Sequence, residues 1–192
     1  PYVNQCLLYR LKTQTGIADL VPIHRIDRET AGIVAFSVNK ETRGIYHQLF
    51  SSGQVQKNYE AIATLPQATT QREWIVKTRI VRGEPWFRMK HVEGPVNAIT
   101  KIRLVERNQR YAYFHLEPLT GKQHQLRLHL SVLGCQILHD RYYPVLQPKR
   151  DDDFTRPLQL LAKELRFIDP ISQQPMKFHS TRILSQSFYS GG

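Results

Sequence analysis

The chain has few cysteines, few acidic residues and no long apolar run, and each shortage excludes a class of protein. Cys6 and Cys135 are its two cysteines among 192 residues, and they lie far apart without a CxxC pair. A disulfide framework and a zinc site with four cysteine ligands are therefore excluded, and we expect a cytoplasmic protein. Because the sequence has neither a membrane-length apolar span nor a basic amphipathic helix with an aromatic face, we expect no membrane association.

The charge that is present is mainly positive. Lys and Arg number 27 against 16 Asp and Glu, which gives a formal net charge of +11 spread along the chain instead of collected in a tail. A folded basic surface attracts polyanions, so we expect RNA or DNA as the partner. A hydrophobic content of 41% is enough for a core, and without an internal repeat or linker residues 1–192 suit one domain.

Hydrophobic patterning predicts few helices and many strands. We expect helices over 40–50, with Asn39 as its cap and Gly53 as its end, and over 122–133, with an apolar stripe along one face. We expect strands over 32–38, 55–64, 74–82, 86–92, 98–106, 111–118 and 158–167. This pattern predicts an α+β fold with a mixed, mostly antiparallel central sheet flanked by a few helices.

The most informative segment is 24–32, His-Arg-Ile-Asp-Arg-Glu-Thr-Ala-Gly. It places Asp27 between Arg25 and Arg28, where a loop enters an apolar strand. Nearby positive charge favours the ionised carboxylate, so Asp27 is poised as an anion. Taken alone, an aspartate between arginines is usually a surface ion pair worth about 0–1 kcal/mol, so the other segments decide its meaning.

Five segments together resemble the RluA-type pseudouridine synthases. Residues 24–32 resemble that family's His-Arg-Leu-Asp-Arg-x-Thr-Ser-Gly signature, and 57–61 resemble its Lys-x-Tyr-x-Ala strand. Residues 119–127, 137–143 and 160–167 resemble its Thr-Gly-Arg-x-His-Gln-Ile-Arg helix start, its Ile-x-Gly-Asp-x-x-Tyr turn and its Leu-His-Ala-x-x-Leu-x-Phe strand. Their order and spacing agree with the family over roughly residues 20–178.

The chain also departs from the family pattern. The departures are Ile26 for Leu, Ala31 for Ser, Lys122 for Arg, His139 for Gly and Leu161 for His. None removes a presumed catalytic group, but Lys122 lacks the planar fork that grips phosphate with two bonds, so substrate choice can differ. The chain begins at Pro1 without the family's upstream Lys-Pro segment or a separate S4-type RNA-binding domain, and we expect a processing boundary there.

The resemblance implies an enzyme that isomerises uridine in structured ribosomal or transfer RNA to pseudouridine. This reaction breaks the N1–ribose bond, turns the base and rejoins it through C5, so it needs a carboxylate but no metal or other cofactor. Asp27 is implied as that carboxylate, acting as a nucleophile or as a base. Tyr59 is implied as a ring for base stacking and a hydroxyl for proton transfer, and Arg127 as a cation that pairs with Asp27 or a phosphate.

Several further side chains are expected to bind the RNA. They are Arg25, Arg28, Thr30, Lys57, Lys122, Gln123 and His124. For Arg28, bracing of the Asp27 loop is an equal alternative. On charge and exposure alone we add 64–74, 147–156 and the strands carrying Arg79, Arg82, Arg88 and Lys90.

Two of the motif residues receive structural interpretations, and one pair of histidines is considered as a metal site. We expect His24 to be a structural hydrogen-bonding residue and Asp140 to bond the backbone of its own turn. His124 and His129 are five apart and do not share a helical face well, so we expect no metal site there.

Two other functions stay open. One is a non-catalytic basic RNA-binding module that acts as a folding chaperone or assembly factor. The other is a glycosidase, which usually needs two carboxylates about 5–10 Å apart, and no motif supplies an acidic partner for Asp27. The sequence suggests no obligate partner, so we expect a monomer.

Overall fold

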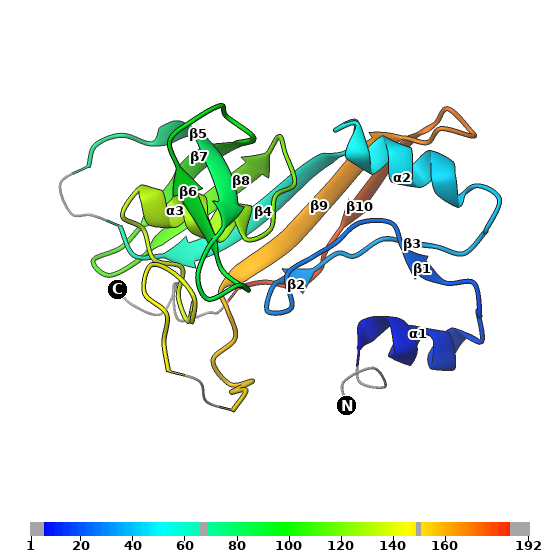
Figure 1. Ribbon diagram of the computed structural model, residues 1–192, viewed down its shortest axis with the longest axis horizontal. Helices are drawn as coiled ribbons and strands as arrows, with labels where there is room; N and C mark the ends of the chain where they lie inside the picture. The colour runs from blue at the N-terminus through cyan, green and yellow to red at the C-terminus, as the bar shows by residue number, and fades with distance from the viewer. Residues whose placement is uncertain (1–5, 66–68, 149–150, 185–192) are drawn as a thin grey trace.

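The computed structural model describes residues 6–65, 69–148 and 151–184 and has the expected α+β fold (Figure 1). The helices are α1 (Leu7–Thr15), α2 (Arg43–Ser51) and α3 (Gln125–Val132). The strands are β1 (Val21–Pro22), β2 (Ala31–Gly32), β3 (Phe36–Ser37), β4 (Gln56–Ala63), β5 (Glu73–Arg82), β6 (Met89–Val92), β7 (Ala98–Arg107), β8 (Ala112–Pro118), β9 (Leu160–Ile168) and β10 (Pro175–His179).

One large sheet organises the described chain. Its order is β10-β9-β4-β8-β7-β5-β6, with antiparallel pairing throughout, while β2 adds a short parallel pairing to β9. The mostly antiparallel sheet is confirmed. Strands β7 and β8 alternate buried and more exposed residues, as period-two patterning requires of a sheet with one covered face.

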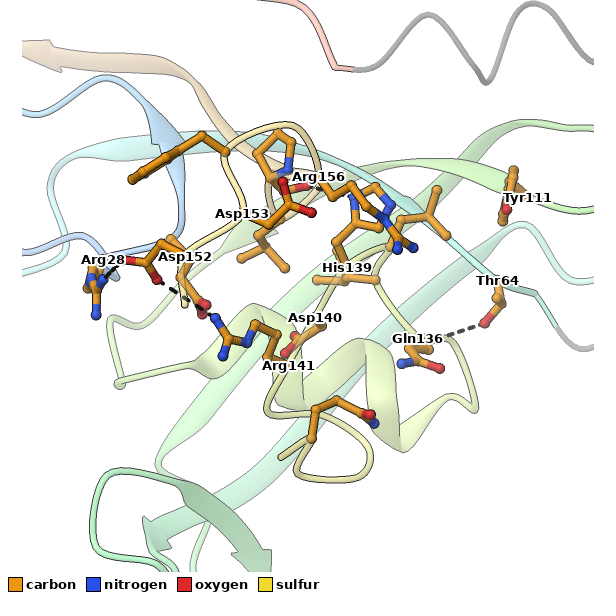
Figure 2. Close-up of a pocket in the computed structure, with 17 residues that line it drawn as sticks. Arg28, Thr64, Tyr111, Gln136, His139, Asp140, Arg141, Asp152, Asp153 and Arg156 are labelled. Atoms are coloured by element: carbon orange, nitrogen blue, oxygen red, sulfur yellow. Dashed lines mark hydrogen bonds and ion pairs between the residues drawn. The ribbon is translucent and has the colours of Figure 1, made fainter. Parts of the chain in front are cut away.

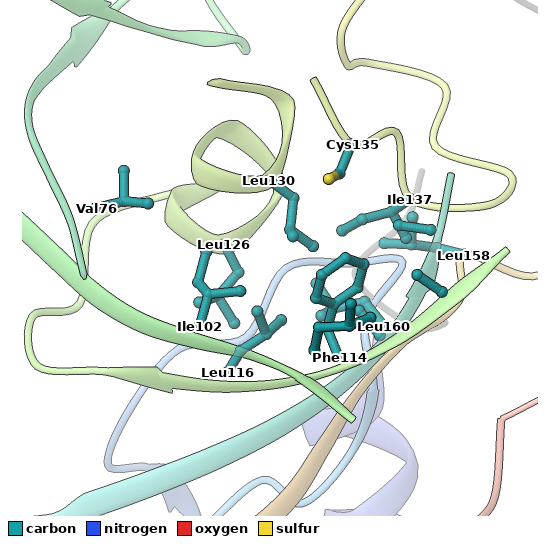
Figure 3. Close-up of a cluster of buried hydrophobic side chains, with 14 residues drawn as sticks. Val76, Ile102, Phe114, Leu116, Leu126, Leu130, Cys135, Ile137, Leu158 and Leu160 are labelled. Atoms are coloured by element: carbon teal, nitrogen blue, oxygen red, sulfur yellow. The ribbon is translucent and has the colours of Figure 1, made fainter. Parts of the chain in front are cut away.

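The main core lies between α3 and this sheet (Figure 3). Leu126 and Leu130 of α3 point toward Phe114 and Leu116 of β8, and all four side chains are buried. Burying one such side chain contributes about 1.5–3 kcal/mol relative to leaving it exposed. The apolar stripe predicted for this helix therefore holds it on the sheet.

Several predicted elements have different bounds. The helix predicted over 40–50 with Asn39 as its cap begins at Arg43 with Thr42 as its N-cap, and the strand predicted over 86–92 begins at Met89. The helix predicted from residue 122 begins at Gln125, because His124 adopts a left-handed backbone with φ 53° that a helix cannot continue through. The single strand predicted over 32–38 is replaced by β2 and β3, because 33–35 leaves the ladder and its apolar side chains pack against α2 and β9 instead.

Three elements were not predicted from the sequence: α1, β10 and the two-residue strand β1. Helix α1 has no buried residue, so packing does not impose a clear apolar stripe on it. Strand β10 is almost entirely exposed and pairs with β9 at the sheet edge, so its sequence shows no apolar alternation. In the parts of the chain that the structure describes, no helix has the length and apolar character needed to span a bilayer.

Gly32 provides the first test of the fold. Its φ is 106°, and a Cβ at this position would overlap the carbonyl oxygen of Ala162 on β9. Replacing Gly32 with Ala is expected to lower the free energy of unfolding by about 2–4 kcal/mol, since both backbone strain and overpacking oppose it. Urea unfolding measures this. Gly44→Ala is the control, because Gly44 is helical with open space around it, and an equal loss there would contradict the explanation.

Glu164 on β9 predicts an acid-dependent loss of stability. It accepts hydrogen bonds from Arg166 Nε at 2.6 Å and Asn58 Nδ2 at 3.0 Å and forms an ion pair with Lys177 at 3.2 Å. Burial alone would raise the pKa of Glu164, but these partners lower it to about 2. The stabilisation is therefore complete above the unfolded pKa of about 4.3 and is lost as pH falls towards 2.

The measurement is urea unfolding across that acidic range. Wild type should lose more stability than Glu164→Gln as the pH falls, because the variant has no carboxylate to protonate. Glu93→Gln, at an exposed position, should follow wild type. Parallel curves for wild type and Glu164→Gln would show that the native carboxylate does not supply this pH dependence.

Candidate active site

Asp27 lies at the start of a tight turn held against the sheet. The backbone N–H of Thr30 donates to the carbonyl of Asp27 at 3.0 Å, and the chain then enters β2, which pairs with β9. His24 supports this loop, since its Nε2 accepts from the Ala35 N–H at 2.9 Å and its ring stacks 4.7 Å from Phe50. The hydrogen bonding predicted for His24 is confirmed, and His24 also lines the cavity that Asp27 lines.

Most of the predicted site residues meet in one cavity of about 400 Å³. Those lining it are Arg25, Asp27, Thr30, Lys57, Tyr59, Lys122 and Gln123. They come from the Asp27 loop, β4 and the loop before α3, which are distant in sequence. Apolar side chains, including Ile23, Leu126 and Leu160, line the rest of the wall. A volume of this size and a mixture of apolar wall and few polar groups are typical of a small-molecule or nucleotide pocket.

Tyr59 places a protonated phenol in this cavity. Burial raises the pKa of Tyr59 to about 12, and the charge of Asp27 adds to the effect. The pairing of β4 with β9 shifts register between Asn58 and Tyr59, an irregularity of the kind that re-aims side chains near active sites. At neutral pH Tyr59 is therefore a neutral phenol that can donate a hydrogen bond, in the cavity that Asp27 also lines.

Lys57 enters the same cavity from β4. Its Nζ donates to the Thr120 carbonyl at 3.5 Å, and burial lowers its pKa. Strand periodicity explains why Lys57 and Tyr59 share a side, since side chains two apart project in the same direction. The cavity thus contains a cation and a phenol supplied by one strand.

A buried glutamine fixes the loop that carries Lys122 and Gln123. The side-chain Oε1 of Gln125 accepts from Thr120 Oγ1 at 2.7 Å and from the Lys122 N–H at 3.0 Å. Its Nε2 donates to Thr100 Oγ1 at 2.9 Å. The loop at the cavity edge is therefore anchored to strand β7 before α3 begins.

Arg127 does not line the cavity. It is 2% exposed, and its guanidinium donates to Asp140 through Nε at 2.8 Å and Nη2 at 2.5 Å, while Nη1 lies 3.1 Å from Glu29 Oε2. Burial alone would lower the pKa of Arg127, but Asp140, Glu29 and Asp27 together raise it. The direct partners of Arg127 are thus Asp140 and Glu29, not the Asp27 carboxylate that the sequence suggested.

Asp140 and His124 extend this buried network. Asp140 Oδ1 also accepts from the backbone N–H groups of Tyr142 at 2.8 Å and Tyr143 at 3.1 Å, which confirms the predicted turn. His124 is buried with its Nδ1 3.0 Å from the hydroxyl of Tyr143, and it does not line the cavity. His124 therefore lies behind the cavity wall, in a position that supports the turn, and not in the RNA-binding position expected from the sequence.

Arg28 lies at a second cavity, of about 480 Å³ (Figure 2). Its guanidinium pairs with Asp152, which also lies 3.7 Å from Arg141 Nη1. Of the two roles expected for Arg28, this pairing corresponds to bracing, because it ties the Asp27 turn to the 151–153 loop.

Some cavity residues were not identified from the sequence. His47, Phe50 and Ser51 reach the cavity from α2, and Glu29 contacts Arg127 from within the Asp27 segment. The spacing of His47 and Phe50, three apart on a helix, was the available signal that they share a face. Within the described residues, no cluster of three or more His, Cys, Asp or Glu side chains is arranged to hold a metal ion.

Comparisons with known proteins agree with this geometry. The family model for RNA pseudouridylate synthases matches residues 2–132. A dual-specificity RNA pseudouridine synthase RluA from Haemophilus influenzae is 29% identical, with 94% of this chain and 80% of that protein covered. A tRNA pseudouridine synthase C from Pasteurella multocida is 31% identical, with 89% and 76% covered. The chain spans 51% of an RNA pseudouridine synthase from Mycoplasma genitalium that is 27% identical.

A solved structure shares the fold. The human RNA pseudouridylate synthase domain containing 1 superposes with a TM-score of 0.79 at 21% identity, covering 97% of this chain and 78% of the human one. The chain therefore belongs to the RNA pseudouridylate synthase family, whose enzymes isomerise uridine to pseudouridine. Within that family it is of the RluA type.

Proposed function

We propose that this chain converts uridine in ribosomal or transfer RNA to pseudouridine, with Asp27 as the catalytic carboxylate. The observation that carries the proposal is the single cavity in which Asp27, Tyr59 and Lys57 meet. The similar proteins named for action on transfer RNA, or for dual specificity, support RNA as the substrate. The net charge of +11 favours binding of a polyanion.

The reaction is balanced without an external reagent. The N1–C1′ bond of uridine breaks, the base turns, a C5–C1′ bond forms, the C5 proton leaves and N1 gains a proton. Asp27 acts in one of two ways. As a nucleophile it forms a covalent bond from which it is later displaced by the uracil, and as a general base it removes a proton. Tyr59 is protonated at neutral pH and supplies a ring and a hydroxyl beside the turning base.

A uridine in folded RNA must leave its stack to enter such a cavity. Extrusion costs a few kcal/mol and is cheapest in loops and bulges, which we propose as the target sites. Lys57, Lys122 and Arg25 line the cavity and are placed to meet the phosphates that flank the extruded nucleotide. Thr30 and Gln123 add polar groups that can bond to the nucleoside.

The proposal extends to organisation and compartment. We propose that residues 1–192 act as one catalytic domain, as a monomer and without a cofactor. Both cysteines are free thiols, as a reducing cytoplasm allows. Asp27 is the one acidic residue among the described residues lining the cavity, so the second carboxylate of a glycosidase is not provided there.

The experiment that tests the function is tritium release from RNA labelled at uridine C5. Formation of the new carbon–carbon bond expels that hydrogen, so release from a ribosomal or a transfer RNA pool identifies both the reaction and the substrate class. RNA binding without release from either pool would contradict the proposal and favour the non-catalytic RNA-binding module.

Tyr59 allows the ring and the hydroxyl to be tested separately. Tyr59→Phe keeps the ring but removes the proton donor, and we expect its single-turnover rate to fall about 10²- to 10⁴-fold with RNA binding unchanged. Tyr59→Leu should also weaken RNA binding, because no ring is left for the base to contact. A Phe variant as active as wild type would show that the hydroxyl takes no part in proton transfer.

A further inference from the structure

One exposed aromatic side chain, Trp86, has no role in the proposed reaction. Trp86 lies in the loop 83–88 between β5 and β6 and is 74% exposed. Aromatic residues are enriched at binding interfaces relative to the rest of the protein surface. Strands β5 and β6 form one edge of the sheet, so the loop is also accessible (Figure 1).

The loop that carries Trp86 is held in place. The Gly83 N–H donates to the Arg88 carbonyl at 2.8 Å, and the Arg88 N–H donates to the Pro85 carbonyl at 2.8 Å. The Met89 N–H donates to the hydroxyl of Tyr143 at 2.7 Å, which fastens the loop to the turn after Asp140. Trp86 is therefore presented by an anchored backbone, at low entropic cost for a partner.

An aromatic row connects Trp86 with the surroundings of the active site. Ring centroids lie 6.0 Å apart from Trp86 to Phe87, 5.3 Å from Phe87 to Tyr142 and 5.5 Å from Tyr142 to His124. The Arg127 guanidinium lies 4.7 Å from the Tyr142 ring. The row thus leads from the buried Arg127–Asp140 network behind the cavity to an exposed ring.

The β5–β6 hairpin that carries Trp86 is also basic. Arg79, Arg82 and Lys90 are exposed on β5 and β6, and Arg88 lies in the loop next to Trp86. Glu84 and Glu93 are the two carboxylates between residues 79 and 93, so cations outnumber them. An exposed aromatic ring among cations is the combination with which proteins bind single-stranded nucleic acid, because bases stack on the ring and phosphates meet the charges.

We propose that Trp86 is a stacking platform for an unpaired base of the substrate RNA outside the catalytic cavity, with Arg82 and Lys90 meeting the adjoining backbone. This inference rests on the proposed function, since it takes RNA as the substrate. It adds a residue for substrate choice: RNAs with an accessible unpaired base beside the target are bound more tightly than RNAs with that base paired.

Intrinsic fluorescence tests the proposal, because the chain has two tryptophans, Trp74 and Trp86. Trp74 is partly buried against the core, so it is the matched control. The probe is a stem-loop RNA with uridines in its loop, titrated against the Asp27→Asn protein so that no turnover occurs. We expect RNA to quench tryptophan emission in the Trp74→Phe variant and to leave emission of the Trp86→Phe variant nearly unchanged.

Binding and activity provide a second readout. Trp86→Ala, made in the otherwise wild-type chain, should weaken stem-loop binding about 5- to 150-fold, with the rate at saturating RNA unchanged and with Trp86→Phe recovering much of the affinity. Arg82→Gln should reduce the slope of log K against log salt concentration by about one, as expected for the loss of one phosphate contact. Quenching that persists in Trp86→Phe, or full affinity in Trp86→Ala, would overturn this inference alone if tritium release continues. Absence of both RNA binding and release would overturn the proposed function together with it.

Discussion

Asp27→Asn is expected to reduce the single-turnover rate of pseudouridine formation by at least about 10³-fold, while RNA still binds. The substitution keeps the size of the side chain but removes the negative charge and the lone-pair basicity that either role of Asp27 requires. The backbone bond from Thr30 to the Asp27 carbonyl does not involve the side chain, so the turn should persist. Tritium release from C5-labelled RNA under single-turnover conditions measures the loss.

Asp19→Asn is the matched control for this substitution. Asp19 is exposed and does not line the cavity, so the variant should release tritium at the wild-type rate. An Asp27→Asn protein that keeps full activity would refute Asp27 as the catalytic carboxylate. A protein that loses RNA binding as well as activity would instead assign Asp27 to holding the RNA or the loop.

Arg127→Gln is expected to lower the free energy of unfolding by about 3–5 kcal/mol, because it leaves the buried carboxylate of Asp140 without its cation. Arg127 and Asp140 are both nearly inaccessible, so water cannot replace the lost partner. Arg127→Lys keeps the charge but loses the paired hydrogen bonds of the guanidinium, so its stability should lie between those of wild type and Arg127→Gln. Urea unfolding with an exposed control, Arg110→Gln, measures these differences.

This prediction separates a positioning role from direct contact with RNA. In the double variant Arg127→Gln/Asp140→Asn, part of the lost stability should return, because Asp140 no longer leaves a buried carboxylate without its cation. If Arg127 instead met the substrate, Arg127→Gln would bind RNA weakly and unfold like wild type. The tests of Asp27 and Arg127 thus distinguish chemistry in the cavity from the scaffold behind it.

The sheet and the main helix could be predicted because their signals are local. Strands β7 and β8 alternate buried and exposed residues, and α3 has apolar residues at helical spacing, so each pattern follows from burying one face. Strand β10 could not be predicted, because an exposed edge strand needs no apolar alternation. Helix α1 was missed for the related reason that it buries no side chain.

The site was predicted in part. Asp27, Tyr59, Lys57 and Lys122 were expected from motifs, and the structure places them around one cavity. The partners of Arg127, Asp140 and Glu29, were not predicted. Helical spacing shows which face of α3 carries Arg127, but not which residues pack against that face.

By itself, the sequence determined the α+β class, the mostly antiparallel sheet and the family, because periodicity and motif order are written in neighbouring residues. Tertiary structure alone decided that Arg127 is buried against Asp140 and that Arg28 pairs with Asp152, a residue 124 positions away. It also decided that α2 contributes to the cavity wall. The physical reason is that charge pairing and burial depend on which distant segments the sheet brings together, and no local pattern contains that distance.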